Sequence, residues 1–376
     1  MLQQSQGNLV DHFSKIKDFR LDRSKKHKLV DIMVIAVCAA ICGADDWNAI
    51  EKFGTAWHEW FQEFIELPNG IPSHDTFNRV FSILSPDAFR ECFTNWVNDL
   101  VNVLPEQIIP IDGKTLRRSH DKKSGKAAIH MVSAWAAESK IVLGQVKTEE
   151  KSNEITAIPE LLRLLNVNGC IVTIDAMGCQ KKITAQIIDQ GGDYVIGLKG
   201  NQGKLHKEVK EFFTESDEQH PESFEFFEQE EKSHGRLTIR RYSTSDAVEA
   251  IPQAIKWKGL STIGMVETEC ERNAKVTHEF RYYIGSIAND AESFAKAVRT
   301  HWEVENELHW VLDVAFREDE SRMRKGNSAE NFAVLRHFAL NSLKLEKTAK
   351  VGIKNKRLMA GWDNAYLLKV LTGRQI

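Results

Sequence analysis

Two short apolar runs that each end in an aspartate constrain the fold more than any other feature of the sequence. The β-branched run IIPI leads into Asp112, and the run CIVTI leads into Asp175. Such runs are typical of buried strands, in which aspartate is rare. A carboxylate at the exit of a buried parallel strand points to the crevice where open α/β sheets bind ligands. Each aspartate can also open a turn, as an Asp-Gly pair does, but two in this arrangement favour a functional site.

These strands belong to a regular series of expected elements. We expect strands at residues 108–112, 127–137, 141–147, 170–175 and 194–198, and helices at residues 153–165 and 176–190. Three strands joined by tight turns, followed by helical crossovers, predict a mixed sheet with helices packed on it. The predicted fold class is therefore α/β, with the sheet domain over residues 105–345.

The rest of the chain has different sequence patterns. Residues 1–104 contain short helices and tight turns, a pattern found both in helix-turn-helix DNA-binding domains and in plain helical bundles. Residues 201–290 interrupt the sheet domain with a charged helix, an acidic loop and three strand-like runs, which predict an antiparallel β-rich insertion. Long helices are expected at residues 291–316 and 329–345, and residues 346–376 are expected to form a basic C-terminal tail.

The helix that begins at residue 291 carries a third carboxylate. At about 100° per residue, Glu305 lies in the middle of an apolar stripe. The stripe consists of Phe294, Val298, Trp302, Leu308, Leu312 and Phe316. Burying an unpaired carboxylate is costly, so Glu305 needs a cation partner, which an arginine from elsewhere could also supply. Asp112, Asp175 and Glu305 together offer the hard oxygen ligands that suit Mg²⁺ or Mn²⁺, and two such ions support phosphodiester chemistry.

The overall charge of the chain argues against DNA binding, but its distribution does not. The 376 residues include 50 Lys+Arg and 53 Asp+Glu, a formal net charge of −3, whereas phosphate binding depends mostly on Lys and Arg. Residues 114–126 nevertheless hold six bases and one acid, and residues 321–357 hold ten bases and two acids. We expect the first group, beside Asp112, to contact phosphate. The part at residues 344–357 fits a solvated face equally well.

No feature of the sequence directs the chain to a membrane. The most apolar stretch, residues 29–44, is too short to span a bilayer and contains Asp31. The N-terminus has neither the basic start nor the apolar core of a signal peptide. The six cysteines fit no zinc spacing and are expected as reduced, buried thiols. We expect a cytoplasmic protein associated with the nucleoid.

Six motifs spread over nearly the whole chain resemble one family. They are PIDGKTLRRS, KTEEKSNEITAIPELL, IDAMGCQKKI, GGDYVIGLKGNQG, EKSHGR and HWEVENELHWVLDVAFRED. In these motifs the chain is similar to the H-repeat-associated proteins, which are DDE-type insertion-sequence transposases. The resemblance implies an RNase H-like catalytic core, preceded by a helical transposase-associated domain and interrupted by a β-rich insertion. It also carries the catalytic triad of the family onto Asp112, Asp175 and Glu305.

The resemblance further implies a reaction and its partners. Hydrolysis at the transposon end would free a 3′-hydroxyl, which then attacks a phosphodiester of the target DNA. The three acids would hold Mg²⁺ or Mn²⁺, and the partners would be terminal inverted repeats, target DNA and further copies of the chain. The candidate DNA contacts are Lys114, Arg117, Arg118, Lys199, Asn201, His234, Arg236, His301, Asn306, His309, Arg322, Arg324 and Lys325.

The catalytic helix departs from the pattern of related DDE families with a similar inserted core. Those families carry Tyr, Arg and Lys at seven and four residues before and seven residues after the catalytic glutamate. This chain has Val298, His301 and Leu312 at these positions. Candidate substitutes for holding the terminal phosphates are Asn306, His309 and Arg317.

Two other functions fit the same residues. His301, Glu305 and His309 share one helix face, which is compatible with a metallohydrolase that uses Zn²⁺ or a redox metal, although the spacing is not that of a zinc protease. Many copies of the family are genomic remnants, so a catalytically silent DNA-binding protein is the second alternative.

Overall fold

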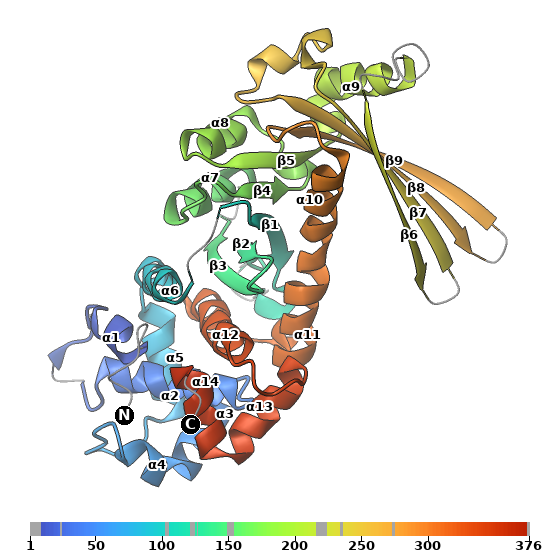
Figure 1. Ribbon diagram of the computed structural model, residues 1–376. Coiled ribbons are helices and arrows are strands. Elements are labelled where there is room, and N and C mark those ends of the chain that lie inside the picture. The colour runs from blue at the N-terminus through green and yellow to red at the C-terminus, as the bar shows by residue number, and fades with distance from the viewer. Residues whose placement is uncertain are drawn as a thin grey trace.

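Within the residues that the structure describes, nine strands form a mixed sheet in the order β3-β2-β1-β4-β5-β9-β8-β7-β6 (Figure 1). The computed structural model describes residues 9–22, 25–101, 105–120, 125, 127–148, 154–215, 224–233, 236–272 and 275–373. The strands are β1 (Ile108–Thr115), β2 (His130–Ala136), β3 (Ile141–Lys147), β4 (Ile171–Ile174), β5 (Asp193–Leu198), β6 (Glu225–Ser233), β7 (Arg236–Ser245), β8 (Thr262–Arg272) and β9 (Lys275–Gly285).

The half of the sheet from β3 to β5 contains both antiparallel and parallel strand pairs. β1, β2 and β3 pair in antiparallel fashion, whereas β4 lies parallel to both β1 and β5. Helices α7 (Glu154–Leu164) and α8 (Lys181–Asp189) cover one face, and α10 (Ala291–Val304) covers the other (Figure 1). Alternate residues of β1 serve the two faces, since Ile108 packs with Phe294 and Val298 of α10 while Ile109 joins the main core. The predicted mixed sheet flanked by helices is confirmed.

Beyond β5, four antiparallel strands extend the sheet into a projecting ribbon (Figure 1). The chain enters it through α9 (Gly203–Glu215), and β9 pairs with β5, so the insertion continues the main sheet. We expected an acidic loop in this part of the insertion because it is rich in glutamate. Part of that segment instead forms strand β6. Those glutamates pair across the ribbon with arginines of β7, with Arg241 close to Glu228 and Arg240 close to Glu231. Cross-strand charge pairs of this kind support a strand that residue propensity does not predict.

Helices from both ends of the chain pack together beside the sheet (Figure 1). They are α1 (Leu9–Ser14), α2 (Leu29–Ile41), α3 (Trp47–Ala56), α4 (His58–Gln62), α5 (His74–Ile83), α6 (Pro86–Leu100), α12 (Ser328–Leu345), α13 (Ile353–Trp362) and α14 (Asn364–Thr372). α12 packs on α2, α5, α6 and β3, and Phe338 of α12 contacts Phe13, Phe89 and Phe93. The N-terminal helices therefore share their hydrophobic core with the sheet and with the last helices. No described helix combines the length and the apolar character needed to cross a bilayer.

The C-terminal region differs from the basic tail that we expected over residues 346–376. Its described part contains α13 and α14, and two of its predicted surface bases are buried. Lys356 donates to the carbonyl oxygen of Leu343 at 3.0 Å, and Arg357 donates to that of Ala40 at 2.9 Å. These cations hold the last helices to the core, because buried charges are retained only where hydrogen bonds satisfy them.

Candidate active site

The register of two parallel strands brings the predicted aspartates together. β1 and β4 pair with Ile111 opposite Ile174, so Asp112 and Asp175 occupy the next position on neighbouring strands. Adjacent strands lie about 4.8 Å apart, and side chains at equivalent positions point to the same face. The register therefore places the two residues side by side where the parallel pairing ends, the position at which open α/β sheets bind ligands.

The electrostatics of this crevice are dominated by carboxylates. Burial raises the pKa of Asp112 to about 6, and the charges of Glu154 and Asp175 act in the same direction against the lowering effect of His309. Burial, followed by the charge of Glu154, also raises the pKa of Asp175. The charges of neighbouring carboxylates thus add to the effect of burial, and His309 beside Asp112 and Lys199 beside Asp175 only partly offset it. A divalent cation would supply further positive charge, so the donor set fits a metal site.

Asp175 also shapes the loop that follows β4. Its Oδ1 accepts hydrogen bonds from the amides of Met177 at 2.9 Å and Gly178 at 3.4 Å. The side chain of Asn201 donates to the carbonyl oxygen of Ala176 at 2.6 Å and so braces the same loop. Asn201, a predicted DNA contact, therefore has a structural role as well. Lys199 beside it is exposed, and its charge is one of the influences that lower the pKa of Asp175.

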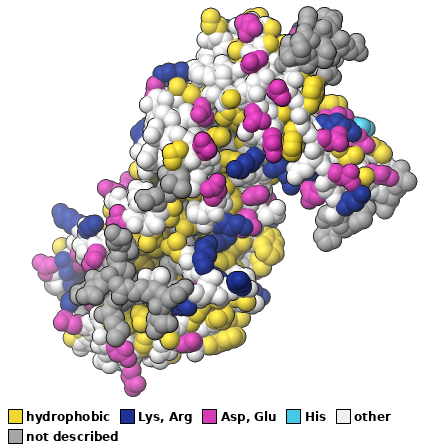
Figure 2. Space-filling model, in the orientation of Figure 1, with side chains coloured by type: hydrophobic (Ala, Val, Ile, Leu, Met, Phe, Trp, Pro, Cys, Tyr) yellow, Lys and Arg dark blue, Asp and Glu magenta, His cyan; other side chains and the backbone are white. Residues whose placement is uncertain are grey.

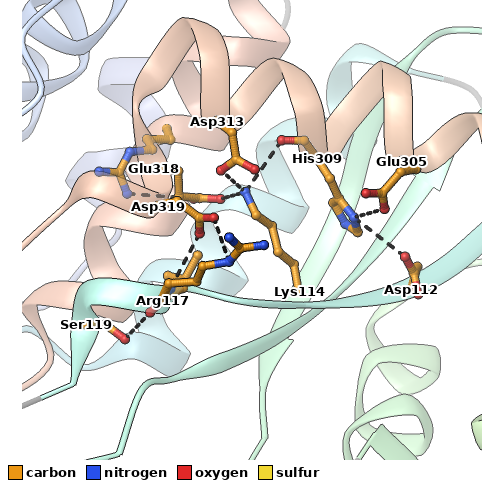
Figure 3. A network of polar contacts seen from close by, with 11 residues as sticks. Asp112, Lys114, Arg117, Ser119, Glu305, His309, Asp313, Glu318 and Asp319 are labelled. Carbon is orange, nitrogen blue, oxygen red and sulfur yellow. Dashed lines mark hydrogen bonds and ion pairs between the residues drawn. The ribbon is translucent and has the colours of Figure 1, made fainter.

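The third acid comes from the long helix that we expected at residues 291–316. α10 passes through a π-helical segment at residues 305–309 into α11 (Trp310–Phe316). From this segment, His309 Nδ1 lies 3.6 Å from Asp112 Oδ2 and 3.4 Å from Glu305 Oε2 (Figure 3). Single π-helical turns occur frequently at functional sites. The helix thus joins Glu305 and His309 to Asp112.

The prediction that Glu305 is buried in the apolar stripe is wrong. Its side chain is 70% exposed, and Trp302 is exposed as well, although Val298 and Leu308 are buried as expected. Val298 and Glu305 lie on the same side of the helix. Val298 packs against the sheet, whereas Glu305 lies beyond the end of β4 and of its pairing with β1. The helical phase therefore identifies the correct residue for the wrong reason.

The ligand atoms of Asp112, Glu305 and His309 all lie within 4.8 Å of one another, a geometry that could hold a metal ion. His301 does not join this group. It is buried with its Nδ1 3.1 Å from Thr173 Oγ1, and burial lowers its pKa to about 4, so the ring is neutral. Buried and neutral, His301 offers no positive charge for the DNA contact that we predicted there, and the metallohydrolase site of His301, Glu305 and His309 is not assembled. His309 is a candidate metal ligand instead of a surface DNA contact.

Lys114, which we expected to contact phosphate, points into the protein (Figure 3). Its side chain is 13% exposed, and its Nζ contacts Asp313 and lies 2.9 Å from Glu318 Oε2. Glu318 is 2% exposed and also lies 3.7 Å from Arg336. Asp112 and Lys114 share a face of β1, so this buried ion network ties the strand to the helix that carries Glu305. The prediction of a DNA contact at Lys114 is wrong.

Most of the other predicted basic contacts lie on one surface. Arg324 Nε donates to the carbonyl oxygen of Arg118 at 3.1 Å, which joins the two basic regions of the sequence. Arg322, Arg324 and Lys325 line a groove of about 500 Å³ beside His74 of α5. Arg117 is exposed, with its Nε 3.1 Å from Asp319. Figure 2 shows Lys and Arg side chains gathered in the middle of the drawn face.

A second groove lies between the ribbon and α10. It has a volume of about 450 Å³ and is lined by Arg236, Arg240, Arg281 and Arg299, together with Glu305 and Asn306. Arg236 and Asn306, both predicted DNA contacts, are thus on the side of the site where Glu305 is exposed. His234 lies outside the described residues.

Known protein families match this chain over most of its length. The family described as "Transposase DDE domain" matches residues 104–342, and the family described as "DDE_Tnp_1-associated" matches residues 10–97. The chain belongs to the DDE transposase family. It is 44% identical over 370 residues to the H repeat-associated putative transposase YhhI of Escherichia coli (strain K12), which covers 97% of this chain and 98% of that protein. The resemblance to H-repeat-associated proteins is confirmed.

Two further comparisons concern transposases. The putative transposase YncI of Escherichia coli O157:H7 is 44% identical over 368 residues, which cover 97% of this chain and 94% of that protein. A cryo-EM structure of a piggyBac transposase synaptic complex with hairpin DNA matches 100% of this chain and 80% of that chain, with 11% identity and a TM-score of 0.41. A similarity this weak supports no conclusion about the present DDE transposase.

This DDE transposase has one more carboxylate beside the site, which sequence reasoning missed. Glu154, the first residue of α7, lies with its Oε1 2.8 Å from His130 Nε2. The signal was Gly113 directly after Asp112, because a glycine inside a strand often marks the close approach of another group. We interpreted the Asp-Gly pair as a possible turn, whereas both residues lie within β1.

Proposed function

We propose that this transposase binds Mg²⁺ or Mn²⁺ through Asp112, Asp175 and Glu305, hydrolyses the phosphodiester at the transposon end and joins the freed 3′-hydroxyl to target DNA. The observation that carries the proposal is the approach of Glu305 and His309 to Asp112, whose neighbour by strand register is Asp175. The strand register supports the Asp112–Asp175 pair, and the contacts of His309 support the approach of Glu305 to Asp112.

The residues around the acids orient them for this chemistry. When bound, the divalent ions would activate the attacking oxygen and stabilise the leaving oxygen of an in-line displacement. His309 lies between Asp112 and Glu305 and holds both carboxylates in one arrangement. The pairing of Lys114 with Glu318 fixes the strand of Asp112 against the end of the catalytic helix. Small displacements of such groups cost large factors in rate, so this scaffold matters to catalysis.

We assign phosphate contacts to exposed bases on both sides of the acids. On one side, the hydrogen bond from Arg324 to the carbonyl oxygen of Arg118 brings bases of the two basic sequence regions together. On the other side, Lys199 lies near Asp175, and Arg236 and Asn306 line the groove that also contains Glu305. Neutralising phosphates with Lys and Arg supplies most of the sequence-independent affinity for DNA. The remaining members of the proposed set are Arg117, Arg322 and Lys325.

We also propose that copies of the chain associate on DNA, because joining two transposon ends needs two active sites in one complex. Light scattering of the protein with and without duplexes that carry the candidate inverted repeats tests this. An assembly of two or more chains on paired ends is expected, and a stable complex of one chain with each end would contradict it.

A plasmid assay tests the proposed chemistry. Supercoiled plasmid carrying the candidate inverted repeats is incubated with Mg²⁺ or Mn²⁺ and either the wild type or Asp112→Asn. We expect nicking by the wild type alone and equal gel shifts for both proteins. Equal shifts without nicking by either protein would favour a catalytically silent DNA-binding protein. Zinc-dependent hydrolysis of a peptide or small molecule, lost in both Glu305→Gln and His301→Ala, would overturn the transposase mechanism.

A further inference from the structure

Two hydrogen bonds link β1, through β2, to the start of α7. Thr115 and His130 face each other across the antiparallel pair, with Thr115 Oγ1 2.8 Å from His130 Nδ1. The other ring nitrogen, Nε2, lies 2.8 Å from Glu154 Oε1. The imidazole therefore bridges the hydroxyl and the carboxylate, and the two contacts together fix the orientation of Glu154.

Gly113 leaves the space that this carboxylate occupies. A Cβ at Gly113 would lie 2.1 Å from Glu154 Oε1 and 2.4 Å from His130 Nε2, closer than real Cβ contacts. Gly113 lies inside β1 and is absent from the glycines with positive φ, so no special backbone conformation requires glycine there. The close approach of Glu154 is the reason for a glycine at this position.

Glu154 lies on the face of the sheet opposite Glu305, beside the strand residue that follows Asp112. Asp112 points towards α10 and Gly113 towards α7, as successive residues of a strand do. β4 ends at Ile174, so the sheet does not continue between Glu154 and the crevice. The charge of Glu154 acts on both Asp112 and Asp175 across this gap.

Glu154 is a largely buried acid without a cationic partner in the part of the chain that the structure describes. Its side chain is 14% exposed, and its one ion-pair partner there is the imidazole of His130. Glu318, which is also buried, has both Lys114 and Arg336. A buried charge is costly unless it is paired or coordinates a metal. Because no Lys or Arg among the described residues pairs with Glu154, a bound cation would offset its charge.

We propose that Glu154 is a fourth carboxylate of the catalytic centre, which binds a divalent cation together with Asp112 and Asp175. His130 and Thr115 are positioning residues that hold it. This inference rests on the proposed function and extends its metal site. Glu154 and Glu305 approach Asp112 from helices on opposite faces of the sheet, so each supplies oxygen ligands to a different side of the site. Two cations that share Asp112 would then each have a ligand of their own.

The test counts bound metal directly, without relying on activity. Mn²⁺ binding to the full chain is titrated by electron paramagnetic resonance for the wild type, Glu154→Gln and Glu160→Gln. Glu160 lies on the same helix and pairs with Arg90, so its variant controls for a lost charge on α7. We expect Glu154→Gln to bind one ion at least about tenfold more weakly. We expect Glu160→Gln to bind as the wild type does.

A second comparison separates metal binding from a structural role. Melting temperatures are measured without metal and with Ca²⁺. Glu154→Gln should melt as the wild type does without metal and gain less from Ca²⁺, because a ligand stabilises only the state that binds it. If Glu154→Gln does not fold, Glu154→Asp keeps the charge but withdraws the carboxylate, and it should show the same weakened binding. Mn²⁺ binding equal to the wild type in the folded variant would overturn the inference.

The positioning residues have their own readout. His130→Phe removes both hydrogen bonds and should weaken Mn²⁺ binding by about 10-fold to 100-fold, whereas His130→Asn retains a donor and should restore part of the affinity. No difference between these two variants would overturn the role of His130. Normal Mn²⁺ binding by Glu154→Gln while Asp112→Asn loses nicking would overturn this inference and leave the proposed function intact. Nicking by Asp112→Asn at the wild-type rate would overturn the proposed function itself.

Discussion

Replacing Lys114 by methionine removes the cation that lies between Asp313 and Glu318. Glu318 is almost fully buried, and its remaining partner, Arg336, is 3.7 Å away. Burial raises the pKa of Glu318, but Lys114, followed by Arg336 and His337, brings this pKa below its usual value. Breaking a buried ion pair by removal of one partner costs about 3–5 kcal/mol. We therefore expect the free energy of unfolding of Lys114→Met to fall by this amount at pH 7.

Urea unfolding, followed by tryptophan fluorescence and far-UV circular dichroism, measures this loss. Arg117→Met is the matched control, because Arg117 is 81% exposed and its replacement should change stability by no more than about 0.5 kcal/mol. The loss in Lys114→Met should also depend on pH. The lowered pKa of Glu318 stabilises the folded wild type above the unfolded-state pKa of about 4.3, and this contribution is lost as the pH falls. The difference between wild type and Lys114→Met should therefore be smaller at about pH 3.5, below the unfolded-state pKa, than at pH 7.

Two results would refute this reasoning. If Lys114→Met has wild-type stability but binds DNA more weakly, Lys114 contacts DNA at the surface, as its position in the sequence predicts. A loss of stability that is the same at both pH values would mean that the aliphatic stem of Lys114 matters and its charge does not. Glu318→Gln added to Lys114→Met should recover part of the loss, since it removes the unpaired charge.

Three further variants test the site and the DNA surface. Glu305→Gln should lose Mg²⁺-dependent nicking while it retains DNA binding, and Glu303→Gln should nick normally; persistent nicking by Glu305→Gln would remove it from the triad. The double variant Arg118→Ala, Arg322→Ala should weaken binding to any DNA duplex. It should also reduce the slope of log K against log salt by about 2, since each lost phosphate contact accounts for roughly 0.9. An unchanged slope in the salt titration would argue against these contacts. Gly113→Ala should displace the Glu154 carboxylate, which lies 2.1 Å from the new Cβ, and slow nicking by about 10²-fold with an unchanged circular dichroism spectrum. A normal rate in Gly113→Ala would show that Glu154 has no part in catalysis.

The central strands could be predicted because their signal is local. Both faces of β1 and β4 are covered by helices, so the runs IIPI and CIVTI are continuously apolar and stand out from the surrounding sequence. β6 carries no such signal. Its glutamates become a strand through arginines of β7 that follow later in the chain, among them Arg240 and Arg241. The sequence of β6 by itself does not show that these arginines will pair with its glutamates.

The charge pattern was informative about DNA binding but could not separate surface bases from interior ones. Lys114, Lys356 and Arg357 lie in basic runs of the sequence, yet all three are turned inward and hydrogen-bonded to the core. Arg118 and Arg322 from the same two runs are exposed. The difference depends on which residues of a strand or helix face the core, and neighbouring elements set that direction.

The sequence alone predicts candidate residues for the chemistry and determines most of the elements that hold them, because the periods of strands and helices act over a few residues. Asp112 and Asp175 follow from these patterns. The packed sheet sets which groups meet. The contact between His130 and Glu154 joins residues 24 positions apart, and that between Lys114 and Glu318 joins residues 204 positions apart. Strand register and helix placement create such contacts, and both depend on the chain as a whole.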